Sequence, residues 1–348
     1  MKKCCCCSEP YESLEALEER LSRPTNGVMD TIRKCRGDLL IIGAGGKIGP
    51  SLATMVRRAM DRLGRKDDVI AVDLFPVPEL KAKLKKLGIR TVTCNFMDRK
   101  QVEKLPDADN VIFMAGQKFG TSQGPELTWA MNTLVPEHAC ERYPSSRIVA
   151  YSTGCVYPLV DVKSGGATEK VPPAPPGDYA NSCVGRERIF TYFSNKNKTP
   201  VAIYRLNYAI DLRYGVLVDI GNKVWKGEPL DVTMGHVNII WQGDANARAI
   251  QCLDLAACPP VPINVTGKDC IPVRRIAQSF GKLMGRKVKL TGKEAKTAWL
   301  SNSSWSYKIF GKPEVDVDQM IAWTAKWIAA GGPSLGKPTH FESRDGKF

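Results

Sequence analysis

The chain has 348 residues, of which 43% are hydrophobic, so it can bury a core large enough for one large domain or two joined domains. No apolar run is long enough to span a bilayer, and the basic start at residues 1–3 lacks the apolar segment of a secretory signal. We therefore expect a cytoplasmic protein without a membrane partner. The formal net charge of +14 raises the question of nucleic acid, but lysines such as Lys81, Lys83 and Lys85 are spread over a predicted helix without interleaved aromatics, so we expect no nucleic-acid partner.

Of the 12 cysteines, four stand together at residues 4–7 and the others are scattered. Because no pair in the folded region has metal-ligand spacing, we predict reduced, mostly buried thiols and no metal site. The four-cysteine tail could bind metal or carry a lipid, but a disordered end without a structural role is the favoured interpretation.

The first predicted elements are a short helix and a strand. Residues 11–22 carry leucines at helical spacing and predict an accessory amphipathic helix. The all-apolar run 39–42, which follows Asp38, predicts a buried parallel strand. The pattern over about 48–63 predicts a helix directly after a glycine-rich turn.

Three glycines, Gly43, Gly46 and Gly49, define that turn. Without a Cβ the backbone can adopt a positive φ and approach a pyrophosphate closely, while the start of the helix offers free N–H groups and the positive end of its dipole. The pattern therefore favours dinucleotide binding, with a plain glycine-rich loop as the alternative.

The second strand, residues 69–74, carries Asp73 near its end, about 24 residues after the last glycine. This is close to the separation at which a carboxylate accepts hydrogen bonds from an adenosine ribose. The Asp73 carboxylate would repel a 2′-phosphate, so this residue favours NAD, although one carboxylate does not exclude NADP. The alternative is that Asp73 is simply a solvated acid at the end of a strand.

The chain then alternates strands and helices. Such a rhythm predicts an α/β fold with a Rossmann-type, doubly wound parallel sheet, because parallel strands need crossover connections. Asp98, after the third strand, either caps the next helix or reaches an adenine amine. At Ala115 and Gly116, after the fourth strand, the main chain is expected to pass close to another group. The predicted helices are 78–87, 127–142 and 179–194, and the strands are 90–94, 110–114, 147–152 and 201–206.

The second half is less regular. The proline-rich residues 171–177 predict a loop over the mouth of the sheet. We expect an N-terminal tail and accessory helix (1–37), a dinucleotide-binding domain (38–210), and a part that is mainly a smaller substrate lobe with a C-terminal tail (211–348). The helices expected in the last part are 216–226, 243–255, 273–284 and 317–330.

Over roughly residues 38 to 290 the chain resembles the extended short-chain dehydrogenase/reductases of the NAD-dependent epimerase/dehydratase type, the group that contains UDP-galactose 4-epimerase. The pieces that carry the resemblance are residues 43–49, Asp73, residues 114–118, Asn132, residues 152–157 and residues 179–182.

The resemblance implies a catalytic pair and a cofactor site. Thr153, four residues before Tyr157, would hydrogen-bond the substrate oxygen, and Tyr179 would be the acid/base. A threonine and a tyrosine that merely pack are the alternative. The implied cofactor is NAD, held by Gly43, Gly46, Lys47, Ile48, Gly49, Asp73, Asp98, Ala115, Gly116, Lys118, Asn132, Tyr179 and Asn207.

The family pattern breaks at Cys183, which stands where a lysine is expected four residues after the tyrosine. Without that lysine, the pKa of Tyr179 stays near its free value of about 10. Three interpretations follow: Cys183 takes part itself as a thiol or thiolate, catalysis is lost and the protein is a noncatalytic dinucleotide-binding sensor or regulator, or another cation restores the activation. The candidate cations are Lys118, Lys163, Arg186 and Arg188.

The substrate is implied only in class. Val237 stands where the family usually has an arginine that grips a nucleotide diphosphate, and neighbouring His236 is as readily a core or surface histidine as a substitute. We therefore expect an NAD(P)-dependent oxidoreductase or epimerase/dehydratase of carbohydrate metabolism, acting on a sugar-like hydroxy or keto compound. The expected partner is that small substrate, and the protein could be a monomer or a homodimer. Nothing in the sequence indicates that residues 338–348 reach the site.

Overall fold

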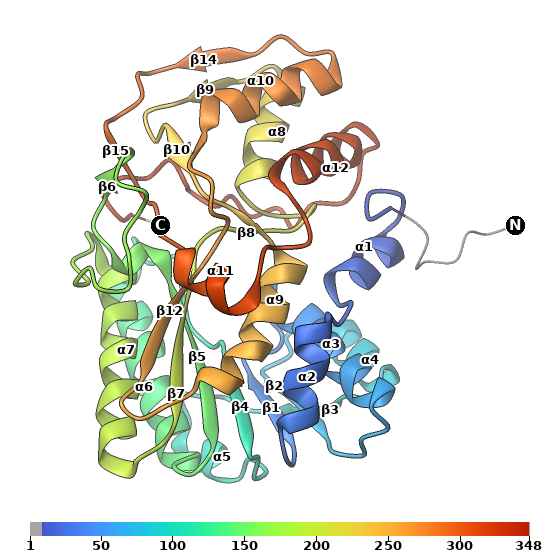
Figure 1. The fold of residues 1–348 in the computed structure, drawn as a ribbon, viewed down its shortest axis with the longest axis vertical. Coiled ribbons are helices and arrows are strands. Elements are labelled where there is room, and N and C mark those ends of the chain that lie inside the picture. Colours follow the sequence, from blue (N-terminus) through green and yellow to red (C-terminus); the bar gives the residue numbers. More distant parts are fainter. Residues whose placement is uncertain (1–8, 348) are drawn as a thin grey trace, which may run out of the picture.

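A computed structural model describes residues 9–347, so the four-cysteine tail lies outside the described residues. Its centre is a seven-stranded parallel sheet in the order β12-β7-β5-β4-β1-β2-β3, which confirms the predicted doubly wound α/β fold (Figure 1). The strands are β1 (Leu39–Ile42), β2 (Val69–Asp73), β3 (Arg90–Thr93), β4 (Asn110–Phe113), β5 (Arg147–Thr153), β7 (Val201–Leu206) and β12 (Val261–Val265).

Helices cover both faces of the sheet, which is why the β1 sequence is apolar throughout. Leu39 and Ile41 pack on one side with residues of α2, α3, α4 and α9, whereas Leu40 and Ile42 pack on the other side with α5, α6 and α7. The helices of the first side are α2 (Asn26–Lys34), α3 (Gly49–Arg62), α4 (Pro78–Lys86) and α9 (Gln242–Gln251). Those of the second are α5 (Arg99–Glu103), α6 (Pro125–Arg142) and α7 (Asp178–Asn197).

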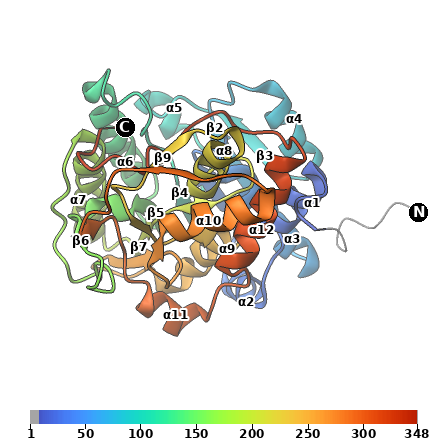
Figure 2. The ribbon, with the colours of Figure 1, turned by 90° about the horizontal axis from the view of Figure 1, so that it is seen from above.

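A smaller lobe stands above the carboxyl ends of the strands (Figures 1 and 2). Its core is formed by α8 (Val216–Lys226), α10 (Val273–Met284) and α12 (Val317–Ala329), joined by α1 (Leu14–Leu21) through Leu17 and Leu21. Helix α2 was not predicted, and β12 brings part of the second half into the main sheet beside β7. Where one domain ends and the next begins stays a prediction.

Short elements complete the lobe and its junction with the sheet. The two-stranded pairs are β6 (Val160–Asp161) with β15 (Thr297–Ala298), β8 (Ala209–Ile210) with β11 (Ile240–Trp241), β9 (Pro229–Asp231) with β14 (Lys289–Thr291), and β10 (His236–Val237) with β13 (Ile271–Pro272); α11 (Ser304–Phe310) follows them. Within residues 9–347, no helix is both long and apolar enough to cross a membrane, and no three side chains of metal-ligating type gather at one point.

Residues 333–347, called here the C-terminal strap, run from α12 back to the start of α7. Phe341 is buried in the lobe core, Trp299 donates from Nε1 to the Ser343 carbonyl at 3.1 Å, and Arg344 donates from Nη1 to the Thr297 carbonyl at 2.6 Å. The strap therefore passes between the lobe and the sheet, and its end lies beside β6, β15 and α7 (Figure 1).

A buried ion pair ties α7 to the sheet. Arg205 on β7 donates to both carboxylate oxygens of Glu187 on α7, at 2.9 and 2.6 Å, and the two residues are 5% and 6% exposed. Ser152 on β5 donates to the same carboxylate at 2.6 Å, and Arg205 also donates to the Tyr157 hydroxyl at 2.7 Å. The Tyr157 hydroxyl in turn donates to Asn264 on β12 at 2.8 Å, so one network joins three strands to α7.

We expect Glu187→Gln to lower the free energy of unfolding by about 3–5 kcal/mol, because Arg205 would keep a buried charge without its counterion. Replacing both Glu187 and Arg205 by Met should recover most of that loss, since no buried charge remains. Urea denaturation measures both effects. The exposed Glu228→Gln is the control and should change stability by no more than about 0.5 kcal/mol; an equally small loss in Glu187→Gln would refute the assignment.

Candidate functional site

The fold itself requires two glycines of the turn after β1. Gly43 has a φ of +84°, and a Cβ there would lie 2.6 Å from the backbone nitrogen of Ala115. A Cβ on Gly49 would collide with the carbonyl of Ala44, so this glycine lets α3 pack closely on the strand. Gly43 and Gly49 therefore have a structural explanation in the chain alone.

Gly46 is different, because space lies open around it. The nearest atom to a Cβ there is the Gly43 carbonyl oxygen at 3.5 Å, an ordinary contact. Helix α3 begins directly afterwards, and no side chain caps it. A helix start with uncapped N–H groups behind an open glycine fits a diphosphate.

Asp73 lies beside the same turn. Its carboxylate accepts hydrogen bonds from the backbone nitrogens of Gly45, at 3.0 Å, and Phe75, at 3.2 Å. This holds the carboxylate at the carboxyl end of β2, where a ribose of a dinucleotide would need it. Asp98, in contrast, caps α5 by accepting from the nitrogen of Lys100 at 3.0 Å, which is the first of its two predicted roles.

The turn after β4 is shaped by Asn132 and Arg186. Asn132 on α6 accepts from the Gln117 nitrogen at 2.9 Å and donates to the Ser182 hydroxyl at 2.8 Å. Arg186 on α7 donates to the Asn132 carbonyl oxygen and to the Tyr151 carbonyl, and a Cβ on Gly116 would collide with its guanidinium. Gly116 thus makes room for a buried arginine, and the Asn132 amide is engaged by the protein.

A pocket of about 180 Å³ lies between the strand ends and the lobe. Six predicted site residues line it: Lys47, Ile48, Lys118, Thr153, Tyr179 and Asn207. The remaining lining residues were not predicted as site residues: Ser152, Cys155, Leu206, Tyr208, Ala209, Tyr214, Gly215, Val216, Gln242 and Thr339. Because Thr339 belongs to the C-terminal strap, a residue far along the sequence forms one wall.

Two of the three predicted catalytic residues, Thr153 and Tyr179, line this pocket. Thr153 ends β5 and accepts from the Cys155 nitrogen at 3.1 Å, while Tyr179 stands in the first turn of α7. Burial first, and then the neighbouring Cys183 thiol, raise the pKa of Tyr179 well above its usual value. The phenol of Tyr179 is therefore protonated at neutral pH.

Cys183 lies behind the tyrosine and is fully buried with Val156, Tyr157 and Ala167. Burial raises the pKa of its thiol, although Arg186 and a hydrogen bond with Tyr179 act in the opposite direction. A nucleophilic thiolate needs a lowered pKa, so these surroundings favour a packed, neutral thiol.

Two of the four candidate cations stand near Tyr179. The ammonium group of Lys118 is 5.7 Å from the centre of the Tyr179 ring and donates to the Thr339 carbonyl at 3.1 Å. Arg186 acts to lower the pKa of Tyr179. Lys163 and Arg188 are exposed.

The ammonium group of Lys47 is 3.1 Å from the centre of the Tyr214 ring. Burial, followed by repulsion from Lys118 and Lys337, lowers the pKa of Lys47 from 10.5 to about 7, against the opposing effect of Asp219 and Asp211. Lys47 is only partly exposed, and an amine held in such a place is costly to the fold, as is common in functional sites.

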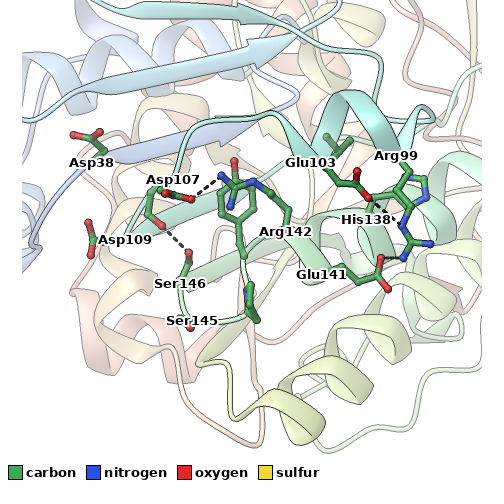
Figure 3. A pocket seen from close by; sticks show the side chains of 14 residues that line it. Asp38, Arg99, Glu103, Asp107, Asp109, His138, Glu141, Arg142, Ser145 and Ser146 are labelled. Carbon is green, nitrogen blue, oxygen red and sulfur yellow. Dashed lines mark hydrogen bonds and ion pairs between the residues drawn. The ribbon is translucent and has the colours of Figure 1, made fainter.

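A second hollow, of about 1080 Å³, opens at the other edge of the sheet (Figure 3). Its side chains pair with one another: Arg142 meets Asp107 at 2.7 Å, Arg99 pairs with Glu141, and Ser146 donates to a backbone carbonyl. Because it lies at the amino ends of β1 and β4, it is on the opposite side from the predicted site residues.

Residues 39–209 match the family model of the NAD dependent epimerase/dehydratase family. The fold and glycine turn define a Rossmann-type protein, and residues 39–209 carry the domain of this epimerase/dehydratase family, as the resemblance predicted. None of the curated proteins compared matches the chain.

Solved structures share the whole architecture at low identity, which shows the fold. A UDP-glucose 4-epimerase of Thermotoga maritima superposes with a TM-score of 0.69 at 14% identity, over 84% of this chain and 99% of that chain. A UDP-glucose 4-epimerase of Thermus thermophilus in complex with NAD gives 0.67 at 19%, over 83% and 98%. A UDP-glucuronic acid 4-epimerase variant of Bacillus cereus, also with NAD, gives 0.69 at 17%, over 84% and 99%.

We expect Lys47→Met to stabilise the protein by about 1–3 kcal/mol near pH 6, because it removes a buried charge. The unfolded chain keeps the Lys47 proton up to its ordinary pKa of 10.5, whereas the folded chain releases it near pH 7. The free energy of unfolding of the parent protein should therefore rise across that window, and the advantage of the variant should shrink toward about pH 10.

Urea denaturation at several pH values measures this effect, with the exposed Lys289→Met as the matched control. A Lys47→Met advantage that is absent, or that grows as the pH rises, would contradict a buried, charged Lys47.

Proposed function

We propose that the protein is an NAD-dependent oxidoreductase or epimerase that acts on a hydroxyl-bearing or keto carbon of a carbohydrate-like substrate. The observation that carries the proposal is that Thr153 and Tyr179, from β5 and α7, line one pocket beside the glycine turn. The match of residues 39–209 to the NAD dependent epimerase/dehydratase family supports the same reaction class.

The dinucleotide would lie over the start of α3. The open space at Gly46, the uncapped N–H groups of α3 and the carboxylate of Asp73 fit its diphosphate and ribose. The choice of NAD rests on Asp73, which would repel a 2′-phosphate, and the similar structures solved with NAD support it. When bound, the nicotinamide supplies the site that accepts or donates hydride.

Tyr179 and Thr153 would handle the substrate oxygen. The Thr153 hydroxyl donates a hydrogen bond to that oxygen, and the protonated Tyr179 phenol gives its proton to it when a carbonyl is reduced. In the oxidative direction Tyr179 must first lose its proton. Because burial raises its pKa, oxidation should become faster as the pH rises above neutral.

Lys118 is our candidate for the cation that replaces the family lysine at position 183. Its ammonium group approaches the Tyr179 ring from the β4 side; burial lowers the pKa of Lys118, against the opposing effects of Cys155, Cys183 and Asp219. A positive charge there stabilises the Tyr179 phenolate and so lowers the barrier to proton transfer. This argument favours an enzyme over the noncatalytic sensor.

We expect Tyr179→Phe to reduce turnover by about 10²–10⁴-fold while NAD binding is retained, because only the proton-transfer group is lost. The measurement is nicotinamide absorbance with a panel of sugars, sugar acids and sugar phosphates, in both directions and across pH. Tyr192→Phe is a matched control, since that tyrosine is exposed on the same helix. Equal turnover in Tyr179→Phe and the parent would refute the role, and NAD binding without turnover on any substrate would favour the sensor.

We expect Gly46→Asp to abolish NAD binding with little change in the melting temperature. The side chain would enter open space rather than the protein core, but its carboxylate would repel a diphosphate. Calorimetric titration with NAD and NADH measures the binding. Gly46→Ala tests size without charge and should weaken binding less. If the parent protein gives no saturable heat with either dinucleotide, the enzyme and sensor proposals both fail.

A further inference from the structure

Three lysines surround the ring of Phe119, and two of them, Lys47 and Lys118, line the pocket. The ammonium groups of Lys47, Lys337 and Lys118 lie 4.7, 5.9 and 6.0 Å from its centre. They come from the glycine turn, the C-terminal strap and the loop after β4, so only the folded chain brings them together. Like charges this close repel one another unless an anion joins them.

The nearby carboxylates are engaged elsewhere. Asp211 accepts from Arg213 through both carboxylate oxygens, at 3.0 and 2.5 Å. Asp219 accepts from the nitrogen and the hydroxyl of Thr339, at 2.8 and 2.5 Å. Neither carboxylate forms a described ion pair with Lys47, whose surroundings therefore suit a further anion.

The position of the Lys47 ammonium group separates the three lysines from the backbone N–H groups that would bind the diphosphate of the cofactor. Its ammonium group packs on Tyr214, just before α8 of the lobe, and faces Lys337 of the strap. The diphosphate cradle instead consists of backbone N–H groups at Gly46 and the start of α3. The cluster thus lies on the lobe side of the pocket, where a substrate rather than the cofactor diphosphate would project.

The size of the pocket limits that substrate. About 180 Å³ is well below the roughly 300–1,000 Å³ of pockets that enclose drug-sized ligands. The strap closes the outer side, because Thr339 is held by Lys118 on one side and by Asp219 on the other. The pocket is the size of a monosaccharide, and an attached nucleotide would have to extend beyond it, past the strap at Thr339.

We propose that Lys47, Lys118 and Lys337 bind the carboxylate or phosphate of a small anionic sugar, whose hydroxyl-bearing or keto carbon faces Thr153 and Tyr179. This inference rests on the proposed function for the identity of the ligand as substrate. It replaces a nucleotide sugar by a sugar acid or sugar phosphate, and it assigns the strap the role of excluding the nucleotide.

Because Lys47 belongs to this cluster, the affinity for an anion should depend on pH. The groups that face Lys47 are Lys118, Lys337, Asp219, Asp211 and the Tyr214 ring, and in the ligand-free protein the pKa of Lys47 is about 7. A bound anion favours the protonated amine and raises that pKa. Affinity for the anion should therefore fall as the pH rises above neutral.

The test is calorimetric titration of the full-length protein, saturated with NAD, with D-glucuronate, D-glucose 6-phosphate, D-glucose, UDP-glucose and inorganic phosphate. We expect at least one of the two anionic sugars to bind about tenfold or more tightly than D-glucose and UDP-glucose, as one charge-assisted contact would give. Whichever of the two sugars binds more tightly shows whether the lysines recognise a carboxylate or a phosphate. The titration with inorganic phosphate measures how tightly the ion binds without a sugar.

Lys47→Met should remove most of this advantage, and the exposed Lys337→Met should remove part of it. Lys289→Met is the control and should keep it. The proposal is overturned if neither anionic sugar binds saturably, if D-glucose or UDP-glucose binds as tightly, or if the advantage survives both variants. NAD binding and Tyr179-dependent turnover of a neutral sugar would then still support the proposed function.

Discussion

The buried pair between Arg205 and Glu187 is the constraint on which the site depends. Glu187 lies two helical turns after Tyr179 on α7, and its carboxylate is held by Arg205 on β7 and by Ser152, next to Thr153 on β5. The pair therefore fixes the start of α7 relative to the end of β5. Because neither buried ion is solvated, the ion pair between Arg205 and Glu187 has to form for the two proposed catalytic residues to line the same pocket.

The same helix explains how the chain accommodates the loss of the family lysine. Cys183 fills its place with a small apolar group, while Arg186, one turn later, occupies the space behind β4 that Gly116 leaves open. Two cationic side chains lie near Tyr179: Arg186, which acts to lower its pKa, and Lys118, 5.7 Å from the centre of its ring. Cys183 is thus accompanied by Arg186 on the same helix and by Gly116 and Lys118 in the turn after β4.

The C-terminal strap gives the pocket its outer wall. Its contacts with Trp299, Thr297 and Asp219 hold it against the lobe, and Thr339 then lies between Lys118 and α8. Since all of these contacts join residues of the same chain, the folded chain by itself forms the narrow pocket. The shared fold with sugar-nucleotide epimerases is therefore compatible with a different substrate size.

The sequence by itself determined the fold class and the family, because the apolar run of β1, its glycine turn and Asp73 are local patterns with a physical meaning that does not depend on distant residues. The chain pattern also located most helices and strands of the sheet. It missed α2, α11 and the strand β12, and it offered no grounds for placing the strap at the site. The tertiary structure decided which cation approaches Tyr179, why Gly116 is a glycine, and that Lys47, Lys118 and Lys337 meet around Phe119. These depend on contacts between residues up to about 290 positions apart, whose pairing is set by packing and charge in the folded state and leaves no periodic signal in the sequence.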